Sequence, residues 1–243
     1  MTEEEWKRHA EAMYLPSLRK QRLFLCAICR RILHLVQDEN CHRAIEIAEG
    51  CADGRTSPED QQASINSVRA ATLSAMEAVA EAARKSGKEP SHYLLESRLS
   101  GKPNSLIATF CATVVCELPL WQRGDASAIK NLIVLSLANS EEAMLFASSR
   151  EDVAEPLAQE SILRDIKCPP STSLDPSWLK WKNGEVKTLS QSIYDDRAFD
   201  QMPELAAVLE EAGCTDTEIL SHCRGPGPHV LGCWVVDLIL GKE

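Results

Sequence analysis

The stretch SPEDQQASINSVRAATLSAMEAVAEAARK, residues 57–85, decides the fold class of this 243-residue chain. Ser57 supplies a side chain that caps a helix N-terminus, Pro58 fits the first helical turn, and two acidic residues follow directly. The alanine-rich run behind this start meets no helix breaker before Gly87 and Pro90. We therefore predict one long helix over residues 57–85.

The segments on both sides of this helix also favour helices. In residues 18–37, apolar side chains recur with the period of a helix that buries one face. Only residues 230–240 resemble a strand, and a lone strand has no partner with which to form a sheet. We predict an all-α fold, a multi-helix bundle with a small helical C-terminal module. The remaining predicted helices span residues 2–13, 40–51, 105–117, 126–148, 156–166, 185–196, 203–213 and 215–223.

A proline-rich stretch indicates where the chain divides. Residues 168–173, Cys-Pro-Pro-Ser-Thr-Ser, cannot continue a helix and carry little to bury. We predict a linker there, between an N-terminal helical domain over residues 1–167 and a C-terminal helical module over residues 174–243. One continuous domain is the alternative.

The apolar end of the chain is expected to belong to the core of this module. We expect it to pack against the predicted helix over residues 203–212, with the indoles of Trp178 and Trp181 nearby. The side chains expected to be buried there are Trp234, Val235, Leu238 and Ile239.

Composition and charge limit the classes of protein to which the chain can belong. A hydrophobic content of 44% and a charged content of 26% are typical of a globular protein. The formal net charge of -10 argues against general nucleic-acid binding, because neutralising phosphates needs an excess of Lys and Arg. The acidic start is unlike a signal peptide, and the apolar-rich run at residues 23–36 is too short and too charged to cross a bilayer. We expect a cytoplasmic protein without a membrane span, in which the ten cysteines are mostly thiols.

The last thirty residues hold the densest group of metal-ligating side chains. Thiolate and imidazole groups are ligands that zinc prefers, and loops rich in glycine and proline can wrap the ion. The spacing, however, contains no Cys-x-x-Cys or His-x-x-x-His pair of the kind found in common zinc modules. Packing of these cysteines as buried thiols is therefore favoured, with a zinc site as the alternative. The candidate ligands are Cys214, His222, Cys223, His229 and Cys233.

A second group of cysteines and histidines lies nearer the N-terminus. Part of it falls within a predicted helix, which would place the side chains on diverging faces. We expect buried thiols there rather than a metal or redox site. The group consists of Cys26, Cys29, His34, Cys41 and His42.

The segment Arg224-Gly-Pro-Gly-Pro-His229 precedes the apolar end of the chain. Its glycines and basic side chains suit an anion, but its two prolines remove backbone donors that a phosphate cradle needs. A rigid connection between two helices is the favoured interpretation. The sequence contains neither a nucleophile elbow nor a deaminase pattern, and we assign no catalytic residue.

Several sequence patterns resemble those of one family. They are W-L-x-W at residues 178–181, I-Y-D-x-R-A-F-D at 193–200, A-G-C-x-D at 212–216, H-C-R at 222–224 and G-C-W-V-V-D-L at 232–238. With these patterns, and with T-E-E-E-W at residues 2–6, the chain resembles a paralogous family of uncharacterised bacterial proteins. Family members follow a Leu-Arg-Asp-Ile segment with a Gly-Asn-Pro-Phe turn, whereas residues 163–166 lead here into Lys-Cys-Pro-Pro. The resemblance implies a bacterial source and no particular activity.

The function that the sequence favours is a non-enzymatic one, as a protein-interaction or adaptor protein, because long helical surfaces can dock partners. We expect a protein partner and no cofactor. The alternative is a protein, or an enzyme, that binds zinc or another small ligand through the region from His222 to Cys233.

Overall fold

A computed structural model describes residues 15–33, 39–89, 154–170 and 172–242. These residues form helices and connections without any strand, which confirms the predicted all-α fold for this part of the chain. The helices predicted over residues 2–13, 105–117 and 126–148 lie outside the described residues. Within the described ranges, no helix is both long enough and apolar enough to cross a membrane.

The part of the chain before the predicted linker contains four described helices. They are α2 (Leu18–Ile32), α3 (Glu39–Ala52), α4 (Pro58–Lys85) and α9 (Ala154–Ile166). The predicted start of the long helix is confirmed, since the Ser57 hydroxyl accepts a hydrogen bond from the amide of Asp60 at 3.1 Å. Ser17 caps α2 in the same way through the amide of Lys20.

The C-terminal part folds into shorter helices joined by tight turns. They are η2 (Trp178–Asn183), α10 (Glu185–Asp196), η3 (Phe199–Gln201), α11 (Met202–Glu211), α12 (Thr217–Arg224) and α13 (Trp234–Leu240). The capping residue of α12 differs from the one that the sequence predicts: Asp216, not Thr215, accepts hydrogen bonds from the amides of Glu218 and Ile219. Residues 168–170 and 172–173 carry no helix, as expected.

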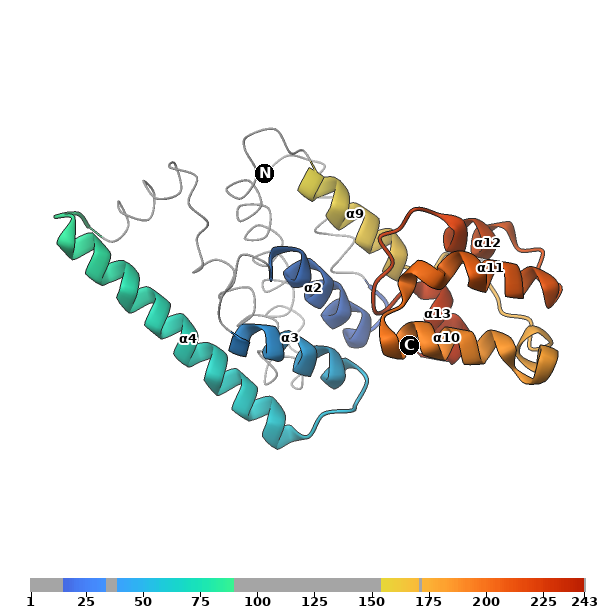
Figure 1. Cartoon of the computed structure of the whole chain (residues 1–243), viewed down its shortest axis with the longest axis horizontal. Helices are drawn as coiled ribbons and strands as arrows, with labels where there is room; N and C mark the ends of the chain where they lie inside the picture. The colour runs from blue at the N-terminus through green and yellow to red at the C-terminus, as the bar shows by residue number, and fades with distance from the viewer. Residues whose placement is uncertain (1–14, 34–38, 90–153, 171, 243) are drawn as a thin grey trace.

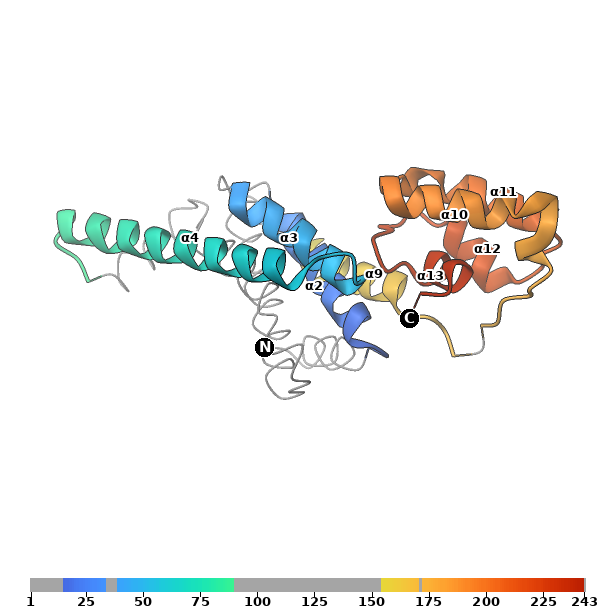
Figure 2. The same ribbon diagram turned by 90° about the horizontal axis from the view of Figure 1, so that it is seen from below.

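The helices are arranged in two groups along the long axis of the molecule (Figure 1). The shorter helices α10–α13 gather at one end, and α4 extends away from them at the other. Between them, α2 packs against both α3 and α9, and α3 packs against α4. Figure 2 shows the same order from a perpendicular direction.

Each of the two groups of helices has its own hydrophobic core. In each core, a residue from the other part of the chain packs with the rest. The first core is built from α2, α3, α4 and α9, and Val230 from the C-terminal part packs against it. The second core is built from the C-terminal helices, and Leu23 of α2 belongs to it. The division into a domain over residues 1–167 and a module over residues 174–243 stays a prediction. Leu23 and Val230 each pack in the core on the other side of this division.

The apolar end of the chain is buried, as the sequence predicts. Trp234, Val235 and Ile239 are 3%, 0% and 2% exposed, and Leu238 is half-buried. The main helix contacts of α13 are with α10 and α12, whereas the sequence predicts contact with the helix over residues 203–212. In addition, α13 carries a buried aspartate that forms ion pairs with side chains of α2.

That aspartate, Asp237, belongs to a buried ionic network that joins four segments. The Arg19 guanidinium of α2 donates to Asp53 Oδ1 at 3.0 Å, to Asp237 Oδ2 at 2.7 Å and to the Tyr194 hydroxyl at 2.8 Å. Lys20 forms an ion pair with Asp237 and donates to the Gly232 carbonyl at 2.7 Å. The network therefore ties α2 to the end of α3, to α10 and to α13.

This network makes folding stability depend on pH. Burial alone raises the pKa of Asp53, but hydrogen bonds from Tyr194 and Arg19 outweigh it and hold the pKa below its ordinary value. A carboxyl group of this kind stabilises the fold above its unfolded-state pKa of about 3.9, and the stabilisation is lost as pH falls through the lower folded-state pKa. We expect Asp53→Asn to be clearly less stable than the native chain at pH 7. Urea unfolding should show this difference shrinking below about pH 4, and a constant difference down to pH 2 would contradict it.

Candidate metal centre

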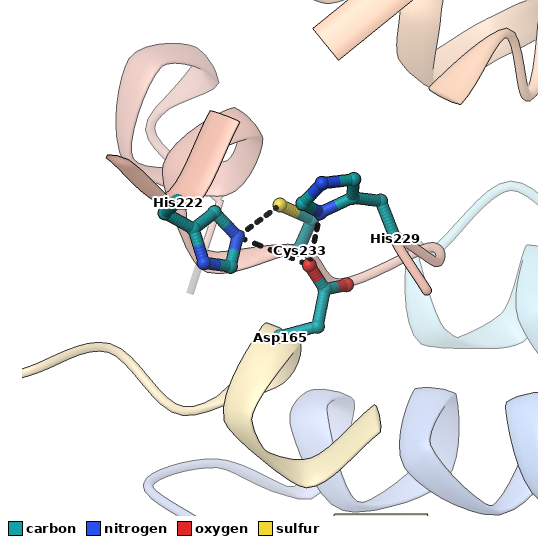
Figure 3. Close-up of side chains that lie close together, drawn as sticks. All are labelled: Asp165, His222, His229 and Cys233. Atoms are coloured by element: carbon teal, nitrogen blue, oxygen red, sulfur yellow. Dashed lines mark hydrogen bonds and ion pairs between the residues drawn. The ribbon is translucent and has the colours of Figure 1, made fainter. Parts of the chain in front are cut away.

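Four metal-ligating side chains meet where α9 contacts the C-terminal helices. Asp165 comes from the last turn of α9, His222 from the end of α12, His229 from the following connection and Cys233 from the residue that precedes α13. One ligand atom of each lies within 4.8 Å of the ligand atoms of the other three. Figure 3 shows the two imidazoles and the thiol arranged around the Asp165 carboxylate.

The Asp165 carboxylate contacts both histidines of this cluster. Its Oδ1 lies 3.0 Å from Nε2 of His222 and 2.7 Å from Nδ1 of His229. Its Oδ2 accepts a hydrogen bond from the amide of Val230 at 2.8 Å. Burial raises the pKa of Asp165, but the two histidine hydrogen bonds outweigh this effect and lower the pKa below its ordinary value. The carboxylate is therefore ionised at neutral pH.

A tryptophan fixes the tautomer of His222. The indole Nε1–H of Trp234 donates to Nδ1 of His222 at 3.1 Å, and an indole nitrogen can only donate. In the neutral imidazole the proton consequently sits on Nε2, where it points at Asp165. The same Nε2 lies 3.3 Å from the sulfur of Cys233.

Cys233 supplies a sulfur that is closed off from solvent. The residue is 1% exposed, and burial, reinforced by the nearby Asp165 charge, raises the pKa of its thiol well above the ordinary value. In the metal-free state the thiol is therefore protonated and is not a reactive nucleophile. A cation placed between the four side chains would favour the thiolate instead.

His229 contributes an atom whose hydrogen-bonding capacity is unused. Its Nδ1 faces Asp165, while its Nε2 is buried and has no hydrogen-bond partner among the described residues. Unpaired buried polar atoms are rare, because each costs about 1–3 kcal/mol. The imidazole also stands edge-on to that of His222, with ring centroids 4.9 Å apart.

The structure brings together three of the five ligands that the sequence nominates. His222, His229 and Cys233 join the cluster, whereas Cys214 and Cys223 do not belong to it. Both of the latter are buried among apolar side chains of the C-terminal core, and burial raises the pKa of the Cys223 thiol to about 12.

The second group named from the sequence is not brought together as a ligand set in the described residues. Cys26 and Cys29 are buried on α2, and Cys41 is buried on α3, all within the first core. His42 is half-buried on α3, and His34 lies outside the described residues.

Asp165 is the member of the cluster that sequence reasoning missed. It follows Ile162 by three positions, which places both side chains near one face of α9. Ile162 is 1% exposed and Asp165 is 2% exposed, so an acidic side chain lies on the buried face of this helix. An acid at a core position of a predicted helix is the signal that would have drawn attention to it.

No protein-family model, curated protein or solved structure matches this chain. The resemblance to a bacterial paralogous family therefore stays a prediction.

Proposed function

We propose that this chain binds a zinc ion through Asp165, His222, His229 and Cys233. The observation that carries the proposal is the convergence within 4.8 Å of four ligand atoms from two segments, Asp165 in one and His222, His229 and Cys233 more than fifty residues further along the chain. The donor set of two imidazoles, one thiol and one carboxylate is borderline-soft, which suits zinc better than magnesium or calcium.

The distances indicate what has to change when the ion enters. A tetrahedral zinc with bonds of about 2.0–2.1 Å separates its nitrogen and oxygen ligands by roughly 3.3 Å. The present histidine–aspartate contacts of 3.0 and 2.7 Å are shorter, because they are hydrogen bonds. Zinc would replace these hydrogen bonds by coordination bonds and open the cluster by a few tenths of an ångström.

A complete set of four protein ligands favours a structural role for the metal. Catalytic zinc sites keep one position for water or substrate, whereas structural sites fill all four with side chains. The ion would fasten α9 to α12 and α13, and its binding energy would add to folding energy. We therefore propose a non-enzymatic protein, an adaptor or interaction protein whose helical surface the metal stabilises.

Elemental analysis of the purified, dialysed protein tests the proposal. We expect one zinc per chain in the native protein and loss of zinc in Cys233→Ser and His229→Ala. Cys223→Ser is the matched control, because it changes a cysteine that is equally buried but outside the cluster. If Cys233→Ser retained zinc, or if native protein from cells grown with zinc contained none, the proposal would be wrong. The cluster would then be only a polar contact between helices.

Metal binding should also be visible in the emission of Trp234. Coordination through Nε2 of His222 moves the imidazole proton to Nδ1, which can then no longer accept from the Trp234 indole. We expect titration of metal-free protein with zinc to change tryptophan emission. The variant Trp234→Phe should still bind one zinc but lose most of that change. An equal change in both proteins would show that His222 is not a ligand in this way.

A further inference from the structure

A separate cavity of about 310 Å³ lies beside the cluster, where the two groups of helices meet. Its walls are largely apolar and come from both cores. They are formed by Leu23 and Ala27 of α2, Ile162 of α9, Phe199 of η3 and Leu231. A volume of this size is at the lower end of the range for small-molecule sites.

The rim of this cavity is basic, although the chain as a whole is acidic. Three arginines, Arg30, Arg31 and Arg197, and one acid, Glu49, line it. Arg30 and Arg197 together with Glu49 carry a charge of +1, in a protein whose formal net charge is -10. The local field at the rim therefore favours an anion.

Glu49 is shared between two guanidinium groups. Arg30 donates to its two oxygens at 2.7 and 2.8 Å, and Arg197 contacts the same two oxygens. A guanidinium carries five N–H donors, so two bonds to Glu49 leave further donors on each arginine. The shared carboxylate orients both arginines while neutralising only one of them.

We propose that this cavity binds a small organic anion, with the apolar body in the cavity and one carboxylate held by Arg30 and Arg197. The planar guanidinium matches a carboxylate in a bidentate pair, and the apolar wall receives the rest of the molecule. The site is distinct from the proposed zinc site, but His229 belongs to the cavity lining and to the zinc cluster.

Three compounds with the same apolar body separate charge from hydrophobic binding: octanoate, octanol and octylammonium. Calorimetric titration of the full chain should give saturable binding of octanoate, with octanol and octylammonium at least about tenfold weaker. Inorganic phosphate alone should bind weakly, because it leaves the apolar wall unfilled. Equal binding of octanoate and octanol, or tight binding of phosphate alone, would overturn the proposal.

Two variants test the location. Ala27→Leu fills the cavity, and we expect it to abolish octanoate binding. Arg197→Gln leaves the cavity open and removes a charge from the rim, and we expect about tenfold weaker binding with helix content unchanged by circular dichroism. Arg164→Gln is the control, because it alters an exposed arginine of α9 outside the cavity. Native octanoate affinity in both Ala27→Leu and Arg197→Gln would place the ligand elsewhere. Zinc content, measured on the same samples, reports separately on the metal cluster.

Discussion

A chain that lacks residues 230–243 should lose cooperative unfolding or become insoluble. The deletion removes five buried apolar side chains, and each contributes about 1.5–3 kcal/mol through burial. Their sum rivals the whole stability of an ordinary domain, about 5–15 kcal/mol. The deletion also removes Cys233 from the proposed zinc site and Asp237 from the ionic network. The five apolar side chains are Leu231, Trp234, Val235, Val236 and Ile239.

The matched control is a chain that ends at Gly241, just after α13. It keeps all five buried side chains and loses only two residues. One of these is Lys242, whose Nζ lies 3.6 Å from Asp53 Oδ2. We expect thermal unfolding of this control to remain cooperative and close to that of the native chain. If the longer deletion unfolded as cooperatively as the native protein, the buried position of α13 would contribute little.

The α-helices of the described residues were predictable because their signals are local. The Ser57 cap, the proline in the first turn of α4 and the apolar repeat of α2 depend on neighbours within a few residues. The same holds for the burial of Trp234 and Val235, since an apolar chain end in a globular protein belongs in a core. Such features need no knowledge of which helix lies beside which.

The candidate site was only partly predictable, because convergence of ligands is a tertiary property. His222, His229 and Cys233 stand out as a dense group in the sequence, but so do Cys214 and Cys223. The difference between these two sets is their distance from Asp165. Asp165 lies on α9, in the other group of helices, and contacts His222 and His229. Residue spacing within the last thirty positions contains no information about that contact.

The ionic network escaped prediction for the same reason. Arg19 and Asp237 are 218 positions apart, and charged residues at such separations give no sign that they will pair. Charged side chains are usually exposed, so the sequence does not indicate that Asp237 is buried or which side chain pairs with it. The ion pair of Asp237, the candidate zinc cluster and the Arg197–Glu49 ion pair all connect the two groups of helices, through α2, α9 and α3 respectively.

Asp237→Asn should cause the largest loss of stability among single changes to this network. Asp237 is 1% exposed and pairs with Arg19 and Lys20, which are themselves largely buried. The amide has the shape of the carboxylate but no charge, so it leaves two buried cations with one fewer anion. Removing one partner of a buried ion pair costs about 3–5 kcal/mol. Urea unfolding at pH 7 measures the loss, and Arg164→Ala, in an exposed ion pair of α9, should change little.

A second substitution shows whether charge or shape is responsible. Lys20 is 5% exposed and forms its ion pair with Asp237, so Lys20→Met removes the cation whose ion pair Asp237→Asn breaks, whereas Arg19 keeps its ion pair with Asp53. We therefore expect Lys20→Met to destabilise the native chain by more than it destabilises Asp237→Asn, with a coupling of about 1–3 kcal/mol. If the two effects add without coupling, Asp237 contributes through packing and through the end of α13 rather than through its charge. The ionic network would then be a consequence of how α13 packs, not its cause.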